Sequence, residues 1–375
     1  MESVLRKICV IIALRLRKTI LIVLMPVKTG WRYLNFWQWC RRFGMTLADV
    51  AAAAGVSTST VSRYVRGQLS VQAVTASRID AALNHTGYKA PLIASDTTTV
   101  GLIVPELRNP YYSDLADELS TQAAASGLTL IMSVSGSTPV RESLAARHMG
   151  AISGLAGIVY LGMNRHNDEL AQLVRRRVPI VVVDEDVDTA ADTISTVTVD
   201  NFGGAYQATN YLIAQGHSRI AHIGGPRGVP TAEARLGGFR AALADHGIDA
   251  LDDYIIRGAY SDQFGANVFR HLAGTGSMPT AVFAASDVVA FGMIGAAERH
   301  GIRIPDDMSI IGCDGVPMGQ WLTPQLTTVA QPISEIARTA IRAFSDLRER
   351  EISRREVLPM QLRVGASVRQ LAQEH

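Results

Sequence analysis

The order of hydrophobic and polar positions divides the chain into a short helical part and a longer α/β part. Between residues 46 and 88, apolar side chains recur at the spacing of amphipathic helices, as in TLADVAAAAG. After residue 99, apolar runs such as VPIVVVDED alternate with amphipathic segments such as YSDLADELSTQAAASG and FGGAYQATNYLIAQGH. Because uninterrupted apolar runs are typical of parallel strands covered on both faces, the longer part is predicted to be a doubly wound α/β fold.

The number of apolar runs indicates two parallel sheets, and therefore two lobes. The strands are predicted in VGLIVP, LTLIMSVS, LAGIVYLG, VPIVVVDED, RIAHIGGP, TAVFAAS and MSIIGCDG. Ligands of such folds bind beyond the carboxyl ends of the strands. We therefore expect a ligand site in the cleft between the two lobes.

The helical part is predicted to contain three short helices around a small apolar core. Thr46 and Asp49 suit the start of a first helix, and Gly55 suits its end, where a positive φ is needed. Ser57 suits the start of a second helix, and a third is expected over VTASRIDAALNHTGY. The second and third helices are expected to close the core with Val61, Val65, Val74, Ile79, Leu83 and Tyr88.

The second helix carries short hydroxyl side chains and guanidinium groups on its outward face. These residues are Thr58, Ser59, Ser62, Arg63 and Arg66. Hydroxyl groups allow a helix to lie deep in the major groove, and an arginine can pair with guanine through two hydrogen bonds. The pattern predicts a helix-turn-helix DNA-binding unit. The alternative is an ordinary helical hairpin with a polar outer face.

This first part resembles the headpiece of the LacI/GalR family of bacterial transcription regulators. The similarity lies in TLADVAAAAGVSTSTVSRYVRG and in the following VTASRIDAALNHTGYKA. The resemblance implies that Thr58, Ser59 and Arg63 read operator bases. It also implies that phosphates are contacted by Thr46, Ser57, Thr60 and Ser62.

The following segment, KAPLIASDTTTVGLIVP, departs from the pattern of that family. It is shorter than the family's hinge segment by more than one helical turn, and it lacks the ARxL-like motif of the hinge helix. Leu92, after Pro91, is a candidate wedge for the minor groove, since inserted apolar side chains kink DNA. A plain flexible linker is the alternative. A shortened or absent hinge helix is favoured.

The α/β part resembles the core of the same family, which is similar to periplasmic sugar-binding proteins. The resemblance runs nearly to the C-terminus, through segments such as VDNFGGAYQATNYLIAQGHSRIAHIGGP and ASDVVAFGMIGAAERHGIRIPDDMSIIGCDG. It implies an effector cleft lined by Tyr112, Asp184, Arg235, Tyr260, Phe283, Ser286 and Asp314. These side chains suit a polyol, because a guanidinium donates to ring hydroxyls, carboxylates accept from them, and tyrosine stacks on a sugar.

Two positions in the expected cleft depart from the family pattern. Ser286 stands where the family usually has Asn, and Glu185 and Asp186 follow Asp184. The additional carboxylates favour an amine-bearing or richly hydroxylated effector and oppose an anionic one.

Charge is distributed unevenly along the chain. Residues 1–44 contain nine Lys and Arg against one acidic residue, a net charge of +8, and residues 45–89 contain four against two, a net charge of +2. Since the whole chain carries +2, the remainder carries −8. A basic N-terminal part followed by an acidic remainder indicates that the N-terminal part binds a polyanion.

The first 44 residues contain apolar runs that are too short to span a membrane, because Arg15, Arg17 and Lys18 interrupt them. This extension is expected to be disordered or a non-native start, with a basic interfacial helix as the alternative.

The sequence lacks the motifs of the common catalytic and metal sites. It contains no G-x-S-x-G, HExxH or Walker loop, and its nine histidines show no metal-ligand spacing. Cys9, Cys40 and Cys313 form no disulfide framework, which fits a reducing cytoplasm. We expect no enzymatic activity, no cofactor and no metal.

The expected domains are an extension (1–44), a headpiece (45–89), a linker (90–98) and a core (99–375). Within the core, three crossovers near Thr198, Thr327 and Glu356 would separate a first lobe (99–197 and 328–355) from a second (198–327 and 356–375).

These observations predict a cytoplasmic, homodimeric transcriptional repressor that binds double-stranded operator DNA. A small-molecule effector, a sugar or a sugar derivative, would control it from the cleft, and no stable membrane association is expected. The alternative is a membrane-associated or secreted sugar-binding receptor that uses the extension as its anchor.

Overall fold

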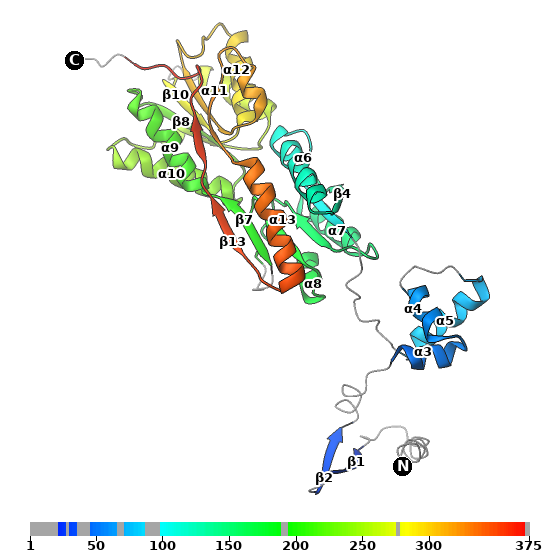
Figure 1. The fold of residues 1–375 in the computed structure, drawn as a ribbon. Helices are drawn as coiled ribbons and strands as arrows, with labels where there is room; N and C mark the ends of the chain where they lie inside the picture. Colours follow the sequence, from blue (N-terminus) through cyan, green and yellow to red (C-terminus); the bar gives the residue numbers. More distant parts are fainter. Residues whose placement is uncertain are drawn as a thin grey trace. The chain divides into compact units, whose positions relative to one another are not determined.

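A computed structural model divides the chain into two compact units, Met1–Ser95 and Asp96–His375 (Figure 1). The structure describes residues 22–27, 30–35, 46–65, 71–86, 98–188, 194–274 and 278–371. Each unit is described by itself.

The first unit contains a β-hairpin and three helices. Strands β1 (Ile22–Val27) and β2 (Gly30–Asn35) pair antiparallel, in the extension for which the sequence indicated disorder or an interfacial helix. The helices are α3 (Leu47–Ala54), α4 (Thr58–Val65) and α5 (Ala73–Thr86).

A small apolar core joins the three helices. Its buried members are Val50, Ala51, Ala54, Val61, Ile79 and Ala82. Leu83 is partly buried against this core as predicted, but Val74 is 74% exposed. Val74 lies in the first turn of α5, one and a half turns before Ile79, and so faces away from the core; the prediction for it was wrong. Tyr88 lies outside the described residues.

The second unit contains two sheets of six strands, which confirms the predicted fold class. The first sheet has the order β13-β7-β6-β5-β3-β4 and is parallel throughout. Its strands, in chain order, are β3 (Thr99–Val104), β4 (Thr129–Val134), β5 (Gly157–Tyr160), β6 (Ile180–Val183), β7 (Ser195–Val199) and β13 (Arg355–Leu358).

The second sheet has the order β14-β12-β11-β10-β8-β9, and only its edge strand β14 runs antiparallel. Its strands are β8 (Ile220–Gly224), β9 (Ile255–Arg257), β10 (Ala281–Ala284), β11 (Ser309–Asp314), β12 (Thr327–Ala330) and β14 (Gln361–Arg363).

Helices cover both faces of each sheet. The first lobe consists of the first sheet with α6 (Pro110–Ala125), α7 (Pro139–Gly150), α8 (Asp168–Arg175) and α13 (Ile333–Arg350). The second lobe consists of the second sheet with α9 (Asn201–Ala214), α10 (Pro230–Asp245), α11 (Asp262–Gly274) and α12 (Asp287–Arg299), and two short 3-10 helices, η1 (Asp252–Tyr254) and η2 (Pro317–Gln320). This covering explains why most of the strands are apolar on both faces.

The chain passes between the lobes three times, after β7, β12 and β13. The second and third passages lie a few residues beyond the expected positions near Thr327 and Glu356. Thr327 begins β12, which belongs to the second sheet, and Glu356 lies within β13, which belongs to the first. The reason is that each strand is completed before the chain leaves its sheet.

One predicted buried strand is an open edge. Strand β4 ends the first sheet, and its Met132 and Val134 are 49% and 51% exposed. Helices α6 and α7 both contact this strand, but its apolar sequence gave no sign that it would lie at the edge of the sheet with these side chains half exposed. Sequence analysis also missed β7, β9, β12, β13 and β14, which are short or rich in hydroxyl and charged side chains.

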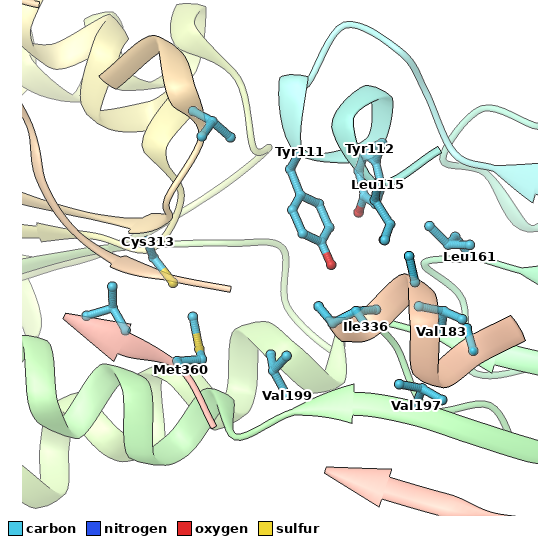
Figure 2. Close-up of a cluster of buried hydrophobic side chains, with 14 of the residues drawn as sticks. Tyr111, Tyr112, Leu115, Leu161, Val183, Val197, Val199, Cys313, Ile336 and Met360 are labelled. Atoms are coloured by element: carbon cyan, nitrogen blue, oxygen red, sulfur yellow. The ribbon is translucent and has the colours of Figure 1, made fainter. Parts of the chain in front are cut away.

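The largest apolar cluster draws side chains from both lobes. Tyr111 and Tyr112 of α6, with Val183 and Ile336, belong to the first lobe, whereas Cys313 belongs to the second (Figure 2). The lobes therefore share one continuous core around the three crossing segments.

Helices α11 and α12 cross so closely that glycine is required at their contact. A Cβ atom at Gly292 would overlap the backbone carbonyl of Asp262, and one at Gly265 would overlap that of Val289. Because backbone cannot give way as a side chain can, we expect Gly292→Ala to lower the free energy of unfolding by about 1–3 kcal/mol in urea titrations. Gly274→Ala is the control, since nothing lies within 4 Å of its Cβ position. Equal stabilities of the two variants would contradict this packing.

Candidate functional sites

The first candidate site is the outer face of α4, which local capping holds in place. The Thr46 N–H donates to the Asp49 carboxylate over 2.8 Å, and Gly55 ends α3 with a φ of 63°. Ser57 then accepts from the Thr60 N–H over 3.1 Å at the start of α4. These contacts agree with the predicted start of the first helix at Thr46, its end at Gly55 and the start of the second helix at Ser57.

Most of the predicted DNA-binding residues are accessible. Those on the surface are Thr46, Ser57, Thr58, Ser59 and Arg63, and those partly exposed are Thr60 and Ser62. Arg66 and Leu92 lie outside the described residues. The hydroxyl of Ser57 lies 2.8 Å from that of Ser59 and 2.7 Å from that of Thr60. The start of α4 thus presents a group of hydroxyls that can donate or accept.

Helix α5 fixes the orientation of this face. The Arg78 guanidinium donates to the carbonyl of Ala54 over 2.6 Å, and the Tyr64 hydroxyl donates to Asp80 over 3.2 Å. Val61 is fully buried behind the face. The sequence did not indicate the roles of Arg78 and Asp80, because polar residues on a third helix have no spacing that reveals their partners.

The second candidate site is a polar cleft between the lobes of the second unit. It is lined by Asn109, Tyr111, Tyr112, Asp184, Glu185, Thr231, Arg235, Tyr260, Ser286, Asp314 and Gln331. All the residues predicted for the cleft except Phe283 are among them. Asn109, Tyr111, Thr231 and Gln331 were not predicted.

Phe283 belongs to the core of the second lobe. It is fully buried, and its ring centroid lies 5.1 Å from that of His222, which in turn stacks on Phe239. Side chains alternate along a strand, so Phe283 of β10 faces the sheet's covering helices, and the chain reaches the cleft only at Ser286 beyond the strand end.

Arg235 of α10 organises the second-lobe side of the cleft. It is 4% exposed, and its guanidinium donates to Asn201 over 2.7 Å, to the carbonyl of Ala285 over 2.6 Å and to Asp314 over 3.2 Å. Asp314 also accepts from Ser286 over 2.9 Å and from the Gln331 amide over 3.1 Å. Arg235 and Asp314 therefore form a buried, hydrogen-bonded ion pair.

Two adjacent carboxylates form the first-lobe side of the cleft. Asp184 accepts from the Tyr111 hydroxyl over 2.8 Å, and Glu185 accepts from the hydroxyl and the N–H of Thr231 over 2.5 and 3.2 Å. Thr231 lies at the start of α10, so Glu185 links the two lobes directly. Burial raises the pKa of Asp184 to about 6, and burial together with neighbouring Asp184 raises the pKa of Glu185 to about 8.

Both central aspartates adopt unusual backbone conformations. The φ of Asp184 is 77° and that of Asp314 is 126°, a region that favours glycine. Asp184 directly follows β6, and Asp314 is the last residue of β11. Strain of this kind persists where the surrounding structure holds a side chain in a required direction, and it concentrates at functional sites.

The lobes lie closed over the cleft. The cavity among its lining residues is about 10 Å³, which is about the space of one water molecule. A ligand of sugar size requires the lobes to separate.

Two further searches concern metals and membranes. Within the parts of the chain that the structure describes, no group of three or more His, Cys, Asp or Glu is arranged to hold a metal ion. In the same parts, none of the helices combines the length and apolar character needed to cross a bilayer.

Comparison with known proteins finds a family match in each of the two units. Residues 46–90 match the family "Bacterial regulatory proteins, lacI family", and residues 209–368 match a "Periplasmic binding protein-like domain". The chain is 33% identical over 306 residues to the HTH-type transcriptional repressor CytR of Escherichia coli K12, covering 80% of this chain and 89% of CytR.

Solved structures agree with these matches. The regulator CelR in complex with cellobiose has a TM-score of 0.67 at 28% identity, over 86% of this chain and 99% of CelR. The lac repressor dimer bound to operator and the anti-inducer ONPF has a TM-score of 0.65 at 25% identity, over 88% of this chain and 99% of that one. The sequence-based resemblance is thereby confirmed: this chain belongs to the LacI family of bacterial transcription regulators.

Proposed function

We propose that this chain is a homodimeric repressor that reads operator DNA with α4 and is controlled by a small-molecule effector in the polar cleft. The observation that supports it most strongly is the buried Arg235–Asp314 pair, which lies on the second-lobe side of a polar cleft that both lobes line. We assign the effector to the sugars or sugar derivatives, as in the CelR–cellobiose complex. We assign no reaction to the chain and place its action in the cytoplasm.

The roles of the surface residues follow from their chemistry. Thr58, Ser59 and Arg63 read base edges, since short hydroxyls and a guanidinium reach into the major groove. Phosphate oxygens accept from the hydroxyls of Thr46, Ser57, Thr60 and Ser62. Arg66 and Leu92 are assigned to DNA as well, on their sequence position alone.

Control requires that the effector bind one arrangement of the lobes better than another. Glu185 and Thr231 form a hydrogen-bonded link between the lobes in the closed arrangement. An effector that enters the cleft displaces this link and favours a wider arrangement. We infer that the change of lobe geometry alters operator affinity through the dimer.

Exposed apolar side chains in both lobes are the proposed dimer surface. In the first lobe they are Met132 and Val134 of the edge strand, and in the second they are Met318 and Trp321, which are 44% and 78% exposed. The lac repressor, a structural neighbour, is a dimer on its operator. Isolated apolar residues are common on surfaces, but an open strand edge with exposed methionine and valine is typical of an interface.

Trp321→Arg is expected to weaken the dimer by about 2 kcal/mol or more, a factor of about 30 in the dissociation constant, because buried tryptophans dominate interfaces. Sedimentation equilibrium measures this constant. Leu251→Arg is the control, since Leu251 is also an exposed apolar residue (52%) of the second lobe outside the proposed surface. A dimer weakened equally by both changes would argue against this surface.

The function is tested by coupling two measurements on the full chain. Thermal unfolding in the presence of sugars and related metabolites identifies ligands, because a ligand that binds the folded state raises its stability. Fluorescence anisotropy with operator DNA then shows whether each ligand changes DNA affinity. The proposal expects the ligands that stabilise the chain to change operator affinity; ligands that bind without any such change would contradict it.

A further inference from the structure

The polar cleft is unbalanced in charge. Its lining contains three carboxylates, Asp184, Glu185 and Asp314, but one cationic side chain, Arg235. Arg235 is paired with Asp314. In the part of the chain that the structure describes, neither Asp184 nor Glu185 forms an ion pair. The two first-lobe carboxylates thus form no direct ion pair, and the nearby Arg235, which lowers the pKa of both, is already paired with Asp314.

Aromatic rings complete the wall around these carboxylates. Tyr111, Tyr112 and Tyr260 all line the cleft, and the rings of Tyr111 and Tyr112 meet edge to face with centroids 5.1 Å apart. Figure 2 shows both rings projecting from α6. The Arg235 guanidinium lies 5.9 Å from the centre of the Tyr260 ring, so one face of this wall already holds a cation. Tyrosine rings with nearby carboxylates are the chemistry that recognises ammonium groups.

Two buried polar atoms in the lining have no partner. The Gln331 side-chain oxygen and the Tyr260 hydroxyl form no hydrogen bond with any residue that the structure describes, and Gln331 is 3% exposed. The Gln331 amide already donates to Asp314, so its free atom only accepts. Asp184 uses one carboxylate oxygen for Tyr111, and the other accepts no hydrogen bond from the described residues. The unused groups on the wall are therefore mainly acceptors.

We propose that the effector of this cleft carries a positively charged nitrogen, as an amino sugar or another hydroxylated amine does. This assignment rests on the proposed effector function of the cleft. An ammonium group only donates hydrogen bonds, and it supplies the direct ion-pair partner that Asp184 and Glu185 lack. An anionic ligand is buried beside two carboxyl groups whose ionisation it opposes, which is strongly unfavourable. A neutral sugar satisfies the acceptors but offers no ion-pair partner to either carboxylate.

The charge imbalance has a consequence without any ligand. Burial raises the pKa of Glu185 to about 8, so the charged form is disfavoured in the folded state. The folded chain then loses stability as pH rises from the ordinary carboxylate range toward about 8. Glu185→Gln removes this loss, so its melting temperature is expected to exceed that of the native chain by a margin that widens from pH 5 to pH 8. Asp186→Asn, beside it but paired with Arg355 at the surface, is the control.

The ligand test compares amines with their neutral and anionic counterparts on the full chain. The probes are D-glucosamine, D-galactosamine and agmatine against D-glucose, D-galactose, N-acetyl-D-glucosamine and D-glucose 6-phosphate. We expect at least one ammonium probe to bind at least about tenfold more tightly than every neutral or anionic probe. Its binding near pH 7 is expected to release protons, since it draws Glu185 and Asp184 into their charged forms. Calorimetry in two buffers of different ionisation enthalpy measures this release.

Each outcome decides one of the two claims. Failure of every ammonium probe to bind, tighter binding of a neutral or anionic probe, or a Glu185→Gln variant that is less stable at pH 8 overturns the charged-nitrogen assignment. A neutral sugar that binds and changes operator affinity overturns it as well, but leaves the proposed function standing. An ammonium probe that binds without changing operator affinity supports the assignment and counts against the regulatory role of the cleft.

Discussion

Arg235→Ala is expected to abolish the effect of ligands on operator binding and to lower the free energy of unfolding by about 3–5 kcal/mol. The guanidinium is buried and bonded to Asn201, to the Ala285 carbonyl and to Asp314. Its removal leaves the Asp314 carboxylate buried without its cation. The variant is thus expected to lose stability as well as a ligand contact. Urea titration measures the free energy of unfolding, and fluorescence anisotropy with operator DNA measures the ligand response.

Arg240→Ala provides the matched control for this prediction. Arg240 lies in the same helix, α10, but is exposed, and its loss is expected to change stability by less than about 0.5 kcal/mol. The folded Arg235→Ala variant should still bind operator, because α4 belongs to the other unit. A normal ligand response in Arg235→Ala would contradict the assignment of the effector site to this cleft. A stability equal to that of Arg240→Ala would contradict the buried ion pair.

Arg63→Ala is expected to weaken operator binding by about 1–3 kcal/mol and to relax the preference for one base pair in each half-site. Arg63 is exposed near the end of α4, and it follows the cluster of hydroxyl side chains around Ser57 along that helix. A guanidinium pairs with guanine through two parallel hydrogen bonds, which an alanine cannot replace. Titrations against operators substituted at single positions measure the loss and its dependence on sequence.

Arg63→Lys separates base reading from charge. Lysine keeps the attraction to phosphates but cannot form the same planar pair, so this variant should retain affinity for unrelated DNA and lose part of its base preference. If the native chain and both variants discriminate equally among operators, Arg63 is not the reading residue.

The parts of the fold governed by local chemistry were predictable from the sequence. Thr46, Gly55 and Ser57 set the helix ends of the headpiece, since capping depends on residues a few positions apart. Continuous apolar runs identified the strands that are covered on both faces. Strand β4 had the same signature, yet it lies at the edge of its sheet with Met132 and Val134 half exposed, because the place of a strand in the sheet order leaves no mark on its own sequence.

Contacts between distant segments were harder to predict. Family resemblance indicated Arg235, Ser286 and Asp314, but not that Asn201 and Gln331 complete their hydrogen-bond network. The link between Glu185 and Thr231 depends on closure of the lobes, which no spacing in the sequence reveals. Phe283 was misplaced because both faces of β10 are covered by helices, and the chain reaches the cleft only beyond the end of this strand.

Selection of DNA from a random duplex library by the full chain tests most directly whether this protein is a dimeric operator reader. We predict enrichment of a pseudo-palindrome whose half-sites lie about one helical turn apart, and loss of that enrichment when Thr58, Ser59 and Arg63 are all replaced by alanine. Absence of any enriched sequence, or the same sequence enriched by the triple variant, would contradict the account.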